Sequence, residues 1–273
     1  MPTACSKHSD GGAAATVDAG TITTALGESS AQLVAFPSGA LTLHGYVWRP
    51  PGAGPFPTIV FNHGSEKQPG TKYDQAQFFV SHGFALFVPH RRGQGSSSDV
   101  APYLGDLLDG GAQDSTVIVD ALGAQTDDVM AAVAYAATLP YADPKRIAVV
   151  GCSFGGIEAL LAAERGTGIV AAVDFAGAAP TWKTNVPLQD RMKVAARNAK
   201  VPVFFIQARN DFDLLPSRIL SEEMTTAGKP ERVKIYPPNG TKPADGHAFC
   251  HGGNAPAWGD DVLDFLYQPM NLP

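Results

Sequence analysis

Gly151-Cys152-Ser153-Phe154-Gly155 is the stretch of this sequence that decides its fold. An apolar, strand-like run (residues 146–150) precedes it, and a helix-like run (residues 156–163) follows it. Gly-x-Ser-x-Gly at a strand-to-helix junction is the nucleophile elbow, a turn so sharp that the serine backbone is strained and its Oγ is exposed above the sheet. We therefore predict that Ser153 is a nucleophile. The alternative is an ordinary strand-to-helix turn in which the serine caps the helix.

The elbow also predicts where an oxyanion would bind. The N–H of the residue after the nucleophile, Phe154, lies at the start of a helix and points to where negative charge develops on a substrate carbonyl. The second donor is expected in the loop after the strand at residues 58–61. There, Gly64 allows the backbone to turn inward, and we assign the donor to the N–H of Ser65.

A serine hydroxyl needs an imidazole to take its proton, and the imidazole needs a carboxylate to orient it. In this architecture the three groups occur in the order serine, acid, histidine. Asp211 follows the strand-like run at residues 203–206, and His247 lies in a loop after the last strand, so both fit this order. Asp213 competes with Asp211, but it also suits the start of the next helix. His251 competes with His247, which Gly246 favours through its tight local backbone.

Strand-like and helix-like segments alternate along the chain from residue 31. We expect strands at residues 31–36, 41–48, 58–61, 84–88, 146–150, 169–175, 203–206 and 233–236, and helices at 73–82, 125–139, 156–163, 216–227 and 258–266. Residues 97–115 read as irregular. Apolar strands that alternate with amphipathic helices predict an α/β fold, with a mostly parallel sheet covered by helices on both faces. We expect a loosely ordered leader (1–30) and one domain (31–273).

The composition argues against two classes of protein, those that bind nucleic acid and those that span a membrane. The 273 residues are 44% hydrophobic and 17% charged, with a net charge of −6 and no basic cluster, which argues against a nucleic-acid partner. No apolar run approaches the roughly 18 residues that suggest a membrane span. The leader lacks the pattern of a secretory signal. We therefore predict a cytoplasmic protein, with the mature form of an exported protein as the alternative.

The three cysteines, Cys5, Cys152 and Cys250, match neither a disulfide framework nor a zinc pattern. We expect Cys152 to be a small buried hydrophobe within the elbow and Cys250 to be inert. No metal and no cofactor are predicted.

Several charged residues near the predicted site have two interpretations each. Arg91 and Arg92 follow a strand; they would either clamp a substrate carboxylate or form an ion pair that anchors their loop. Glu66 would either line the pocket or remain solvated. His63 is expected to be structural.

These residues resemble the α/β-hydrolase superfamily, and most closely its dienelactone-hydrolase-like branch. The resemblance spans roughly residues 40–268 and rests on Asn62-His-Gly-Ser-Glu66, His90-Arg-Arg-Gly-Gln-Gly95, Asp143-Pro-Lys-Arg-Ile-Ala-Val-Val-Gly-Cys-Ser-Phe-Gly-Gly156, Gln207-Ala-Arg-Asn-Asp-Phe-Asp213 and Gly246-His247. It implies the α/β-hydrolase fold. The enzymes that name the branch carry Gly-x-Cys-x-Gly with a thiol nucleophile, whereas this chain has Ser153 at that position. Hydrolysis of dienelactones is therefore not the expected activity.

Many relatives insert a lid between the strands near Phe175 and Val203. The segment at residues 177–200 is short, so we expect only a minor cap and an accessible pocket that takes short acyl or alcohol groups. Phe154 and Trp182 are candidate pocket walls, with core packing as the alternative.

We predict a serine carboxylesterase that cleaves small carboxylic esters through an acyl-enzyme. The nearest alternative is a peptidase of the acylaminoacyl type, which usually carries an added propeller or gate that we do not expect here. A non-catalytic binding module on the same fold is the alternative from another class. Oligomeric state is left open.

Overall fold

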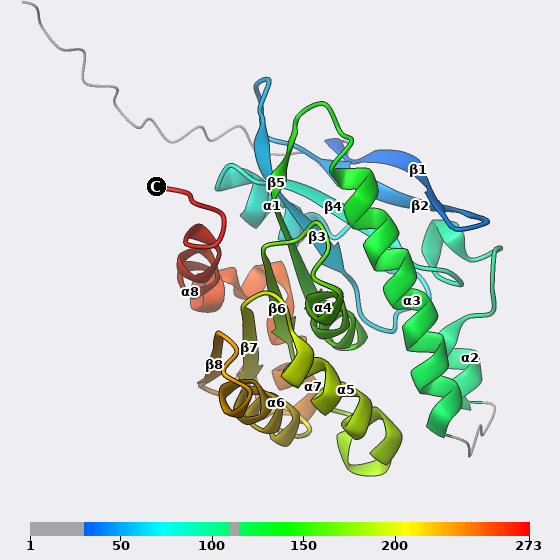
Figure 1. Cartoon of the computed structure of the whole chain (residues 1–273), viewed down its shortest axis with the longest axis vertical. Helices are drawn as coiled ribbons and strands as arrows, with labels where there is room; N and C mark the ends of the chain where they lie inside the picture. Colours follow the sequence, from blue (N-terminus) through cyan, green and yellow to red (C-terminus); the bar gives the residue numbers. More distant parts are fainter. Residues whose placement is uncertain (1–29, 110–114) are drawn as a thin grey trace, which may run out of the picture.

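The computed structural model describes residues 30–109 and 115–273. These residues form one eight-stranded sheet with helices packed against it (Figure 1). The strand order is β1-β2-β4-β3-β5-β6-β7-β8. The strands are β1 (Gln32–Ser38), β2 (Leu41–Trp48), β3 (Phe56–Asn62), β4 (Ala85–His90), β5 (Ala142–Cys152), β6 (Ala171–Phe175), β7 (Val203–Ala208) and β8 (Glu231–Tyr236). Residues 1–29 of the predicted leader lie outside the described residues.

The directions of the strands determine which edge of the sheet can carry a site. β1 pairs antiparallel with β2, and β2 pairs antiparallel with β4, so the two strands expected at residues 31–36 and 41–48 are present and adjacent. All other neighbours are parallel. The carboxyl ends of β3, β5, β6, β7 and β8 therefore meet at one edge, where ligands bind in open α/β sheets. β5, which carries the elbow, lies between β3 and β6.

Alternate residues of the strands face two separate hydrophobic cores. Val60 and Val149 belong to one core, together with residues of the helices on that face. Their neighbours Ile59 and Ala148 belong to the other core. The helices are α1 (Tyr73–Ser81), α2 (Leu104–Asp109), α3 (Ser115–Ala136), α4 (Phe154–Arg165), α5 (Val186–Asn198), α6 (Leu215–Thr226), α7 (Pro243–His247) and α8 (Ala255–Tyr267).

The helices form a layer on each face of the sheet. Residues of α3, α4, α5 and α6 share the first core, and residues of α1 and α8 share the second. Figure 1 shows α8 on one side of the sheet and α3, α4 and α5 on the other. This arrangement is the predicted α/β fold, with a mostly parallel sheet covered on both faces.

The long helix α3 begins ten residues before the predicted start at Gln125. Its first turns contain β-branched residues and Gly123, which disfavour a helix locally. Ile118 and Leu122 are nevertheless buried in the first core, so tertiary packing outweighs local propensity. The stretch predicted as irregular, residues 97–115, also contains α2, and a 3₁₀ turn, η2 (Gly95–Ser97), ends at its first residue.

The segment predicted as a minor cap contributes mainly to the helix layer. α5 is capped by Asn185, whose Oδ1 accepts from the Leu188 N–H at 2.9 Å, and it packs against α3, α4 and α6. The part that stays at the sheet edge is η3 (Trp182–Thr184), where Lys183 Nζ lies 4.0 Å from Asp213 Oδ2. Within residues 30–109 and 115–273, no helix is both long and apolar enough to cross a bilayer.

Candidate active site

Ser153 connects β5 to α4 in a strained backbone conformation. Its φ is 58° and its ψ is −118°, a region that L-residues rarely adopt. The flanking glycines make the turn possible, because a Cβ on Gly151 would lie 1.8 Å from Gly155 O, and one on Gly155 would lie 2.0 Å from Asn62 O. The predicted elbow geometry is therefore present, and it holds the serine at the carboxyl edge of the sheet.

A chain of hydrogen bonds joins Ser153 to His247 and Asp211. Ser153 Oγ lies 2.8 Å from His247 Nε2, and His247 Nδ1 lies 2.9 Å from Asp211 Oδ1. With the proton on Nδ1, the imidazole donates to Asp211 and leaves Nε2 to accept the serine proton. The three residues come from the ends of β5 and β7 and from α7.

The loop after β7 orients the carboxylate of Asp211. Gln207 Nε2 donates to Oδ2 at 2.9 Å, and the Phe212 N–H donates to Oδ1 at 2.7 Å. The Asp211 side chain is fully buried. Asp213, the predicted competitor, accepts from the Leu215 N–H at 3.0 Å, at the start of α6, whereas His247 Nδ1 is hydrogen-bonded to Asp211. The structure thus brings Asp211 to the imidazole and places Asp213 at the helix start.

His247 lies at the end of the short helix α7, where a loop was predicted. Gly246 is needed there for close packing, because a Cβ on it would lie 2.6 Å from the backbone carbon of Asn210 and 2.7 Å from Asp211 N. Asn210 Nδ2 also donates to the Lys242 carbonyl at 2.9 Å. The acid loop and α7 are therefore packed together. The competitor His251 is exposed beyond η4 (Ala248–Cys250) and hydrogen-bonds neither Ser153 nor Asp211.

The predicted oxyanion donors flank Ser153. The Phe154 N–H is at the start of α4, and Ser65 lies in the loop after β3. That loop approaches the serine closely, since a Cβ on Gly64 would lie 3.4 Å from Ser153 Cβ. Tyr103 Oη donates to the Ser65 carbonyl and so helps to hold the loop. Within the described part of the chain, neither of the two N–H groups donates to a protein acceptor.

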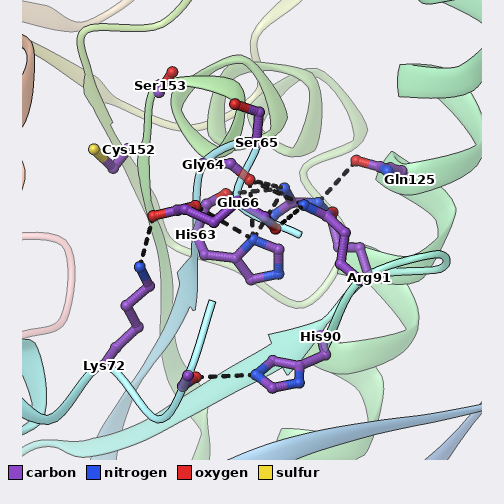
Figure 2. A network of polar contacts seen from close by, with 12 residues as sticks. His63, Gly64, Ser65, Glu66, Lys72, His90, Arg91, Gln125, Cys152 and Ser153 are labelled. Carbon is purple, nitrogen blue, oxygen red and sulfur yellow. Dashed lines mark hydrogen bonds and ion pairs between the residues drawn. The ribbon is translucent and has the colours of Figure 1, made fainter. Parts of the chain in front are cut away.

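Arg91 braces the loop after β3 from within the protein. Its side chain is fully buried, and Nη2 donates to the carbonyls of His63 and Gly64, each at 2.9 Å. Nε donates to Gln125 Oε1 at 2.9 Å. Figure 2 shows the guanidinium directed at this backbone. The predicted substrate clamp is therefore wrong for Arg91, because burial leaves no group free to reach a ligand, and the anchor consists of neutral acceptors and not an ion pair.

Arg92 and His63 make further contacts in the loops after β4 and β3. Arg92 forms the ion pair predicted as one alternative, with Nη2 2.7 Å from Asp128 Oδ1 and Nε 2.9 Å from Oδ2. His63 is buried, and its Nδ1 lies 3.0 Å from the Gly64 carbonyl. Burial, and then the Arg91 charge, hold the pKa of His63 well below its ordinary value. It is therefore neutral at physiological pH, consistent with a structural role.

Glu66 lies in the loop after β3, close to the serine. Its carboxylate pairs with Lys72, with Nζ 2.8 Å from Oε1, and 42% of its side chain is exposed. Oε2 would lie 3.0 Å from a Cβ on Gly64, the same position that faces Ser153. Burial raises the pKa of Glu66, but Lys72 opposes this and the net shift is downward, so the group is ionised. In Figure 2, Glu66 extends from the loop toward Lys72.

The two aromatic candidates for the pocket wall are buried. Trp182 is 2% exposed and belongs to the first core, and Phe154 is 7% exposed. This placement favours core packing for Trp182. Phe212, which the sequence reasoning missed, is 47% exposed, and its ring centroid lies 5.5 Å from that of His247. Its place directly after Asp211 was the available signal.

Cys152 and Cys250 form a disulfide, so the expectation of unpaired cysteines is wrong. Their Cα atoms are 5.9 Å apart, although 98 residues separate them in sequence. Spacing patterns could not reveal one such long-range pair. The signal that existed was their position, because Cys152 precedes Ser153 and Cys250 follows His247 by three residues. Within residues 30–109 and 115–273, no group of three potential metal ligands is found.

The sequence profile described as "Dienelactone hydrolase family" matches residues 43–260. The chain belongs to this family. Its members' fold and hydrolase class are therefore those of this protein, and the match covers the elbow, Asp211 and His247.

Two proteins that this dienelactone hydrolase family member resembles are each less than 25% identical to it. "Protein usf" of Aquifex pyrophilus is 24% identical over 209 residues, which cover 75% of this chain and 83% of that protein. The acylaminoacyl peptidase of Pyrococcus horikoshii superposes with a TM-score of 0.67 at 20% identity, over 89% of this chain and 42% of that one. The chain thus spans less than half the length of that peptidase.

A solved structure of comparable length also shares the fold. The putative dienelactone hydrolase of Klebsiella pneumoniae subsp. pneumoniae MGH 78578 superposes with a TM-score of 0.65 at 18% identity, over 87% of this chain and 98% of that one. At these identities the structural likeness shows the α/β-hydrolase fold alone. The chemistry of this family member has to be argued from its own site.

Proposed function

We propose that this protein is a serine hydrolase that cleaves small carboxylic esters through an acyl-enzyme intermediate. The observation that supports it most is the continuous hydrogen-bonded chain from Ser153 Oγ through the His247 imidazole to the buried Asp211 carboxylate. A strained elbow and two available backbone N–H groups beside the serine complete the requirements of acyl transfer.

The reaction would proceed in two halves. Ser153 Oγ attacks the ester carbonyl carbon while His247 Nε2 takes the hydroxyl proton, and the Phe154 and Ser65 N–H groups stabilise the oxyanion. The tetrahedral intermediate collapses, the C–O bond to the leaving alcohol breaks, and the imidazolium returns its proton to that alcohol. Water then attacks the acyl-enzyme with His247 as base, which releases the acid and restores Ser153.

Two features support small substrates with an apolar part. α5 packs into the helix layer and not over the sheet edge, so this segment contributes little cover to the site. The exposed ring of Phe212 beside His247 offers an apolar surface to an acyl or alcohol group. A small-molecule ester is therefore the proposed partner, and nucleic acid is not expected.

Replacement of Ser153 by alanine tests the assignment. Loss of the nucleophile should lower kcat for p-nitrophenyl acetate by about 10³-fold or more while the fold is retained. Initial rates measured beside circular dichroism provide the check. The wild-type protein should also be labelled at Ser153 by a fluorophosphonate, which an inert binding module would not react with. Undiminished hydrolysis by Ser153→Ala would refute the proposal.

A peptidase of the acylaminoacyl type is the second candidate, because the fold is shared with the Pyrococcus horikoshii acylaminoacyl peptidase. Ester and amide cleavage use the same triad, so geometry does not separate them. Turnover of a short p-nitrophenyl ester compared with a p-nitroanilide of the same acyl group distinguishes the two. We expect the ester to be the better substrate by more than the difference in their intrinsic reactivity.

Cytoplasmic location was the first prediction, with an exported protein as the alternative. The Cys152–Cys250 disulfide favours the exported alternative, because disulfides persist mainly in oxidising compartments.

A further inference from the structure

The Cys152–Cys250 disulfide connects the two halves of the proposed catalytic pair. Cys152 is the last residue of β5 and directly precedes Ser153. Cys250 ends η4, which continues directly from the helix that carries His247. The bond therefore crosslinks the strand that holds the nucleophile to the segment that holds the base, within three residues of each.

The histidine segment is secured differently on its two sides. Toward the acid, Asn210 hydrogen-bonds the backbone at Asn239 and Lys242, and Gly246 packs against the Asp211 backbone. Toward the serine, the covalent link is the disulfide. The remaining support of η4 comes from the second core and from α1 and α8, for example the 3.0 Å hydrogen bond from Trp258 Nε1 to the Phe249 carbonyl.

This asymmetry matters because the imidazole has to satisfy two partners at once. If the serine side loosened, the acid side would still hold His247, but the 2.8 Å contact between Nε2 and Ser153 Oγ would no longer be enforced. A displacement of about 1 Å in a catalytic group lowers rates by about a hundredfold. Substrate binding, which depends on the pocket walls, would change less.

We propose that the Cys152–Cys250 disulfide is a positioning device that holds His247 over Ser153, so that hydrolysis by this enzyme depends on the redox state of the pair. The inference rests on the proposed serine hydrolase function. It assigns to two cysteines a role that neither the fold nor the triad requires. A purely stabilising crosslink would instead change unfolding without changing turnover of the folded enzyme.

The chemistry of the switch is thiol–disulfide exchange. A thiolate of a dithiol attacks one sulfur and forms a mixed disulfide, and the other cysteine leaves as a thiolate. The second thiol of the reagent then displaces the remaining cysteine. The protein gains two electrons and two protons as two thiols, and the reagent is oxidised to its cyclic disulfide. Cys152 is partly buried and Cys250 is 1% exposed, so Cys152 is the more accessible of the two residues.

The test compares oxidised and reduced forms of the full chain. Protein purified without reductant is assayed for kcat and KM with p-nitrophenyl acetate before and after dithiothreitol treatment, and again after reoxidation. Mass spectrometry of alkylated protein reports the state of the cysteines. Assays are run well below the thermal midpoint of each form, measured by circular dichroism. The double variant Cys152→Ala/Cys250→Ala removes the bond permanently, and Cys5→Ala is the matched control.

We expect reduction to lower kcat by about tenfold or more, while KM changes by less than about twofold. The rate of fluorophosphonate labelling of Ser153 should fall in parallel, and reoxidation should restore both. The double variant should have the low kcat regardless of dithiothreitol, and Cys5→Ala should behave as wild type.

Two results would overturn the proposal. One is an unchanged kcat and labelling rate in the reduced, folded enzyme, including the case in which only the thermal midpoint falls. The other is the finding of two free thiols at positions 152 and 250 in a fully active protein purified without reductant. If the oxidised wild type neither hydrolyses esters nor is labelled by a fluorophosphonate, the proposed serine hydrolase function fails and the positioning role fails with it.

Discussion

Ser153 carries a backbone conformation that costs free energy, of the order of 1–3 kcal/mol for a non-glycine residue. The cost is sustained because the hydrogen bond from its N–H to the Phe175 carbonyl, at 2.8 Å, and the packing of α4 hold the turn. This turn holds Ser153 Oγ at hydrogen-bond distance from the His247 imidazole. Strain at one residue is thus linked directly to the proposed nucleophile.

Asp211→Asn tests the role of the carboxylate at the same scale. An amide at this position favours the wrong tautomer of His247, since it can donate to Nδ1, and kcat should fall by about 10³–10⁴-fold. Asp213→Asn is the matched control, because Asp213 serves the start of α6 and should keep kcat within about threefold. Steady-state kinetics on both variants decide the point. Equal losses in the two would contradict the assignment of Asp211.

At the scale of elements, the site depends on how closely loops approach one another. The loop after β3 is held near the serine by hydrogen bonds from the buried Arg91 and from Tyr103 to its carbonyl groups. The acid loop and α7 are joined by Asn210. The residues proposed as oxyanion donor, acid and base are therefore held by hydrogen bonds to Arg91, Tyr103 and Asn210, and such preorganisation limits reorganisation during reaction.

Gly246→Ala tests the contact between α7 and the acid loop. The added Cβ would lie within 2.6–2.7 Å of backbone atoms of Asn210 and Asp211, so α7 must shift and carry His247 with it. We expect kcat to fall by about a hundredfold with a smaller change in KM. Gly253→Ala is the matched control, because its Cβ meets nothing within 4 Å. Wild-type kcat in Gly246→Ala would show that the close packing is not needed.

At the scale of the whole molecule, a buried carboxyl group couples stability to pH. Glu158 on α4 is fully buried and accepts from Thr126 Oγ1 on α3 at 2.7 Å. Burial raises the pKa of Glu158 to about 8, against the opposing effect of Arg91. Because the unfolded chain releases this proton near pH 4.5 and the folded protein near pH 8, the folded state binds more protons in between. Its contribution to stability therefore falls as pH rises through that window.

Glu158→Gln removes this titration and should flatten the pH dependence. The drop in thermal midpoint between pH 5 and pH 9 should be smaller in the variant than in the wild type, as measured by calorimetry. Glu222→Gln, an exposed position on α6, is the control and should retain the wild-type drop. An identical drop in Glu158→Gln and the wild type would show that Glu158 does not titrate in this range.

Much of the architecture could be predicted because it follows from local patterns. The strand β2 begins and ends at its predicted residues, and most other elements differ from prediction by a few residues at their ends. The larger differences arose where tertiary contacts override local propensity, as in the first turns of α3, where Ile118 and Leu122 enter the core. They also arose around His247, where packing of Gly246 on the acid loop selects a short helix.

The sequence by itself determined the elbow, the order of serine, acid and histidine, and the parallel sheet whose edge brings them together. These depend on turn geometry and on hydrophobic periodicity, which are properties of neighbouring residues. Three outcomes depended on the tertiary structure. Asp211, and not Asp213, is hydrogen-bonded to His247, and the Arg91 side chain is buried against the loop after β3. Cys152 is paired with Cys250. Those outcomes depend on contacts between residues far apart in the chain, and spacing along the sequence carries no record of which distant side chains the fold brings into contact.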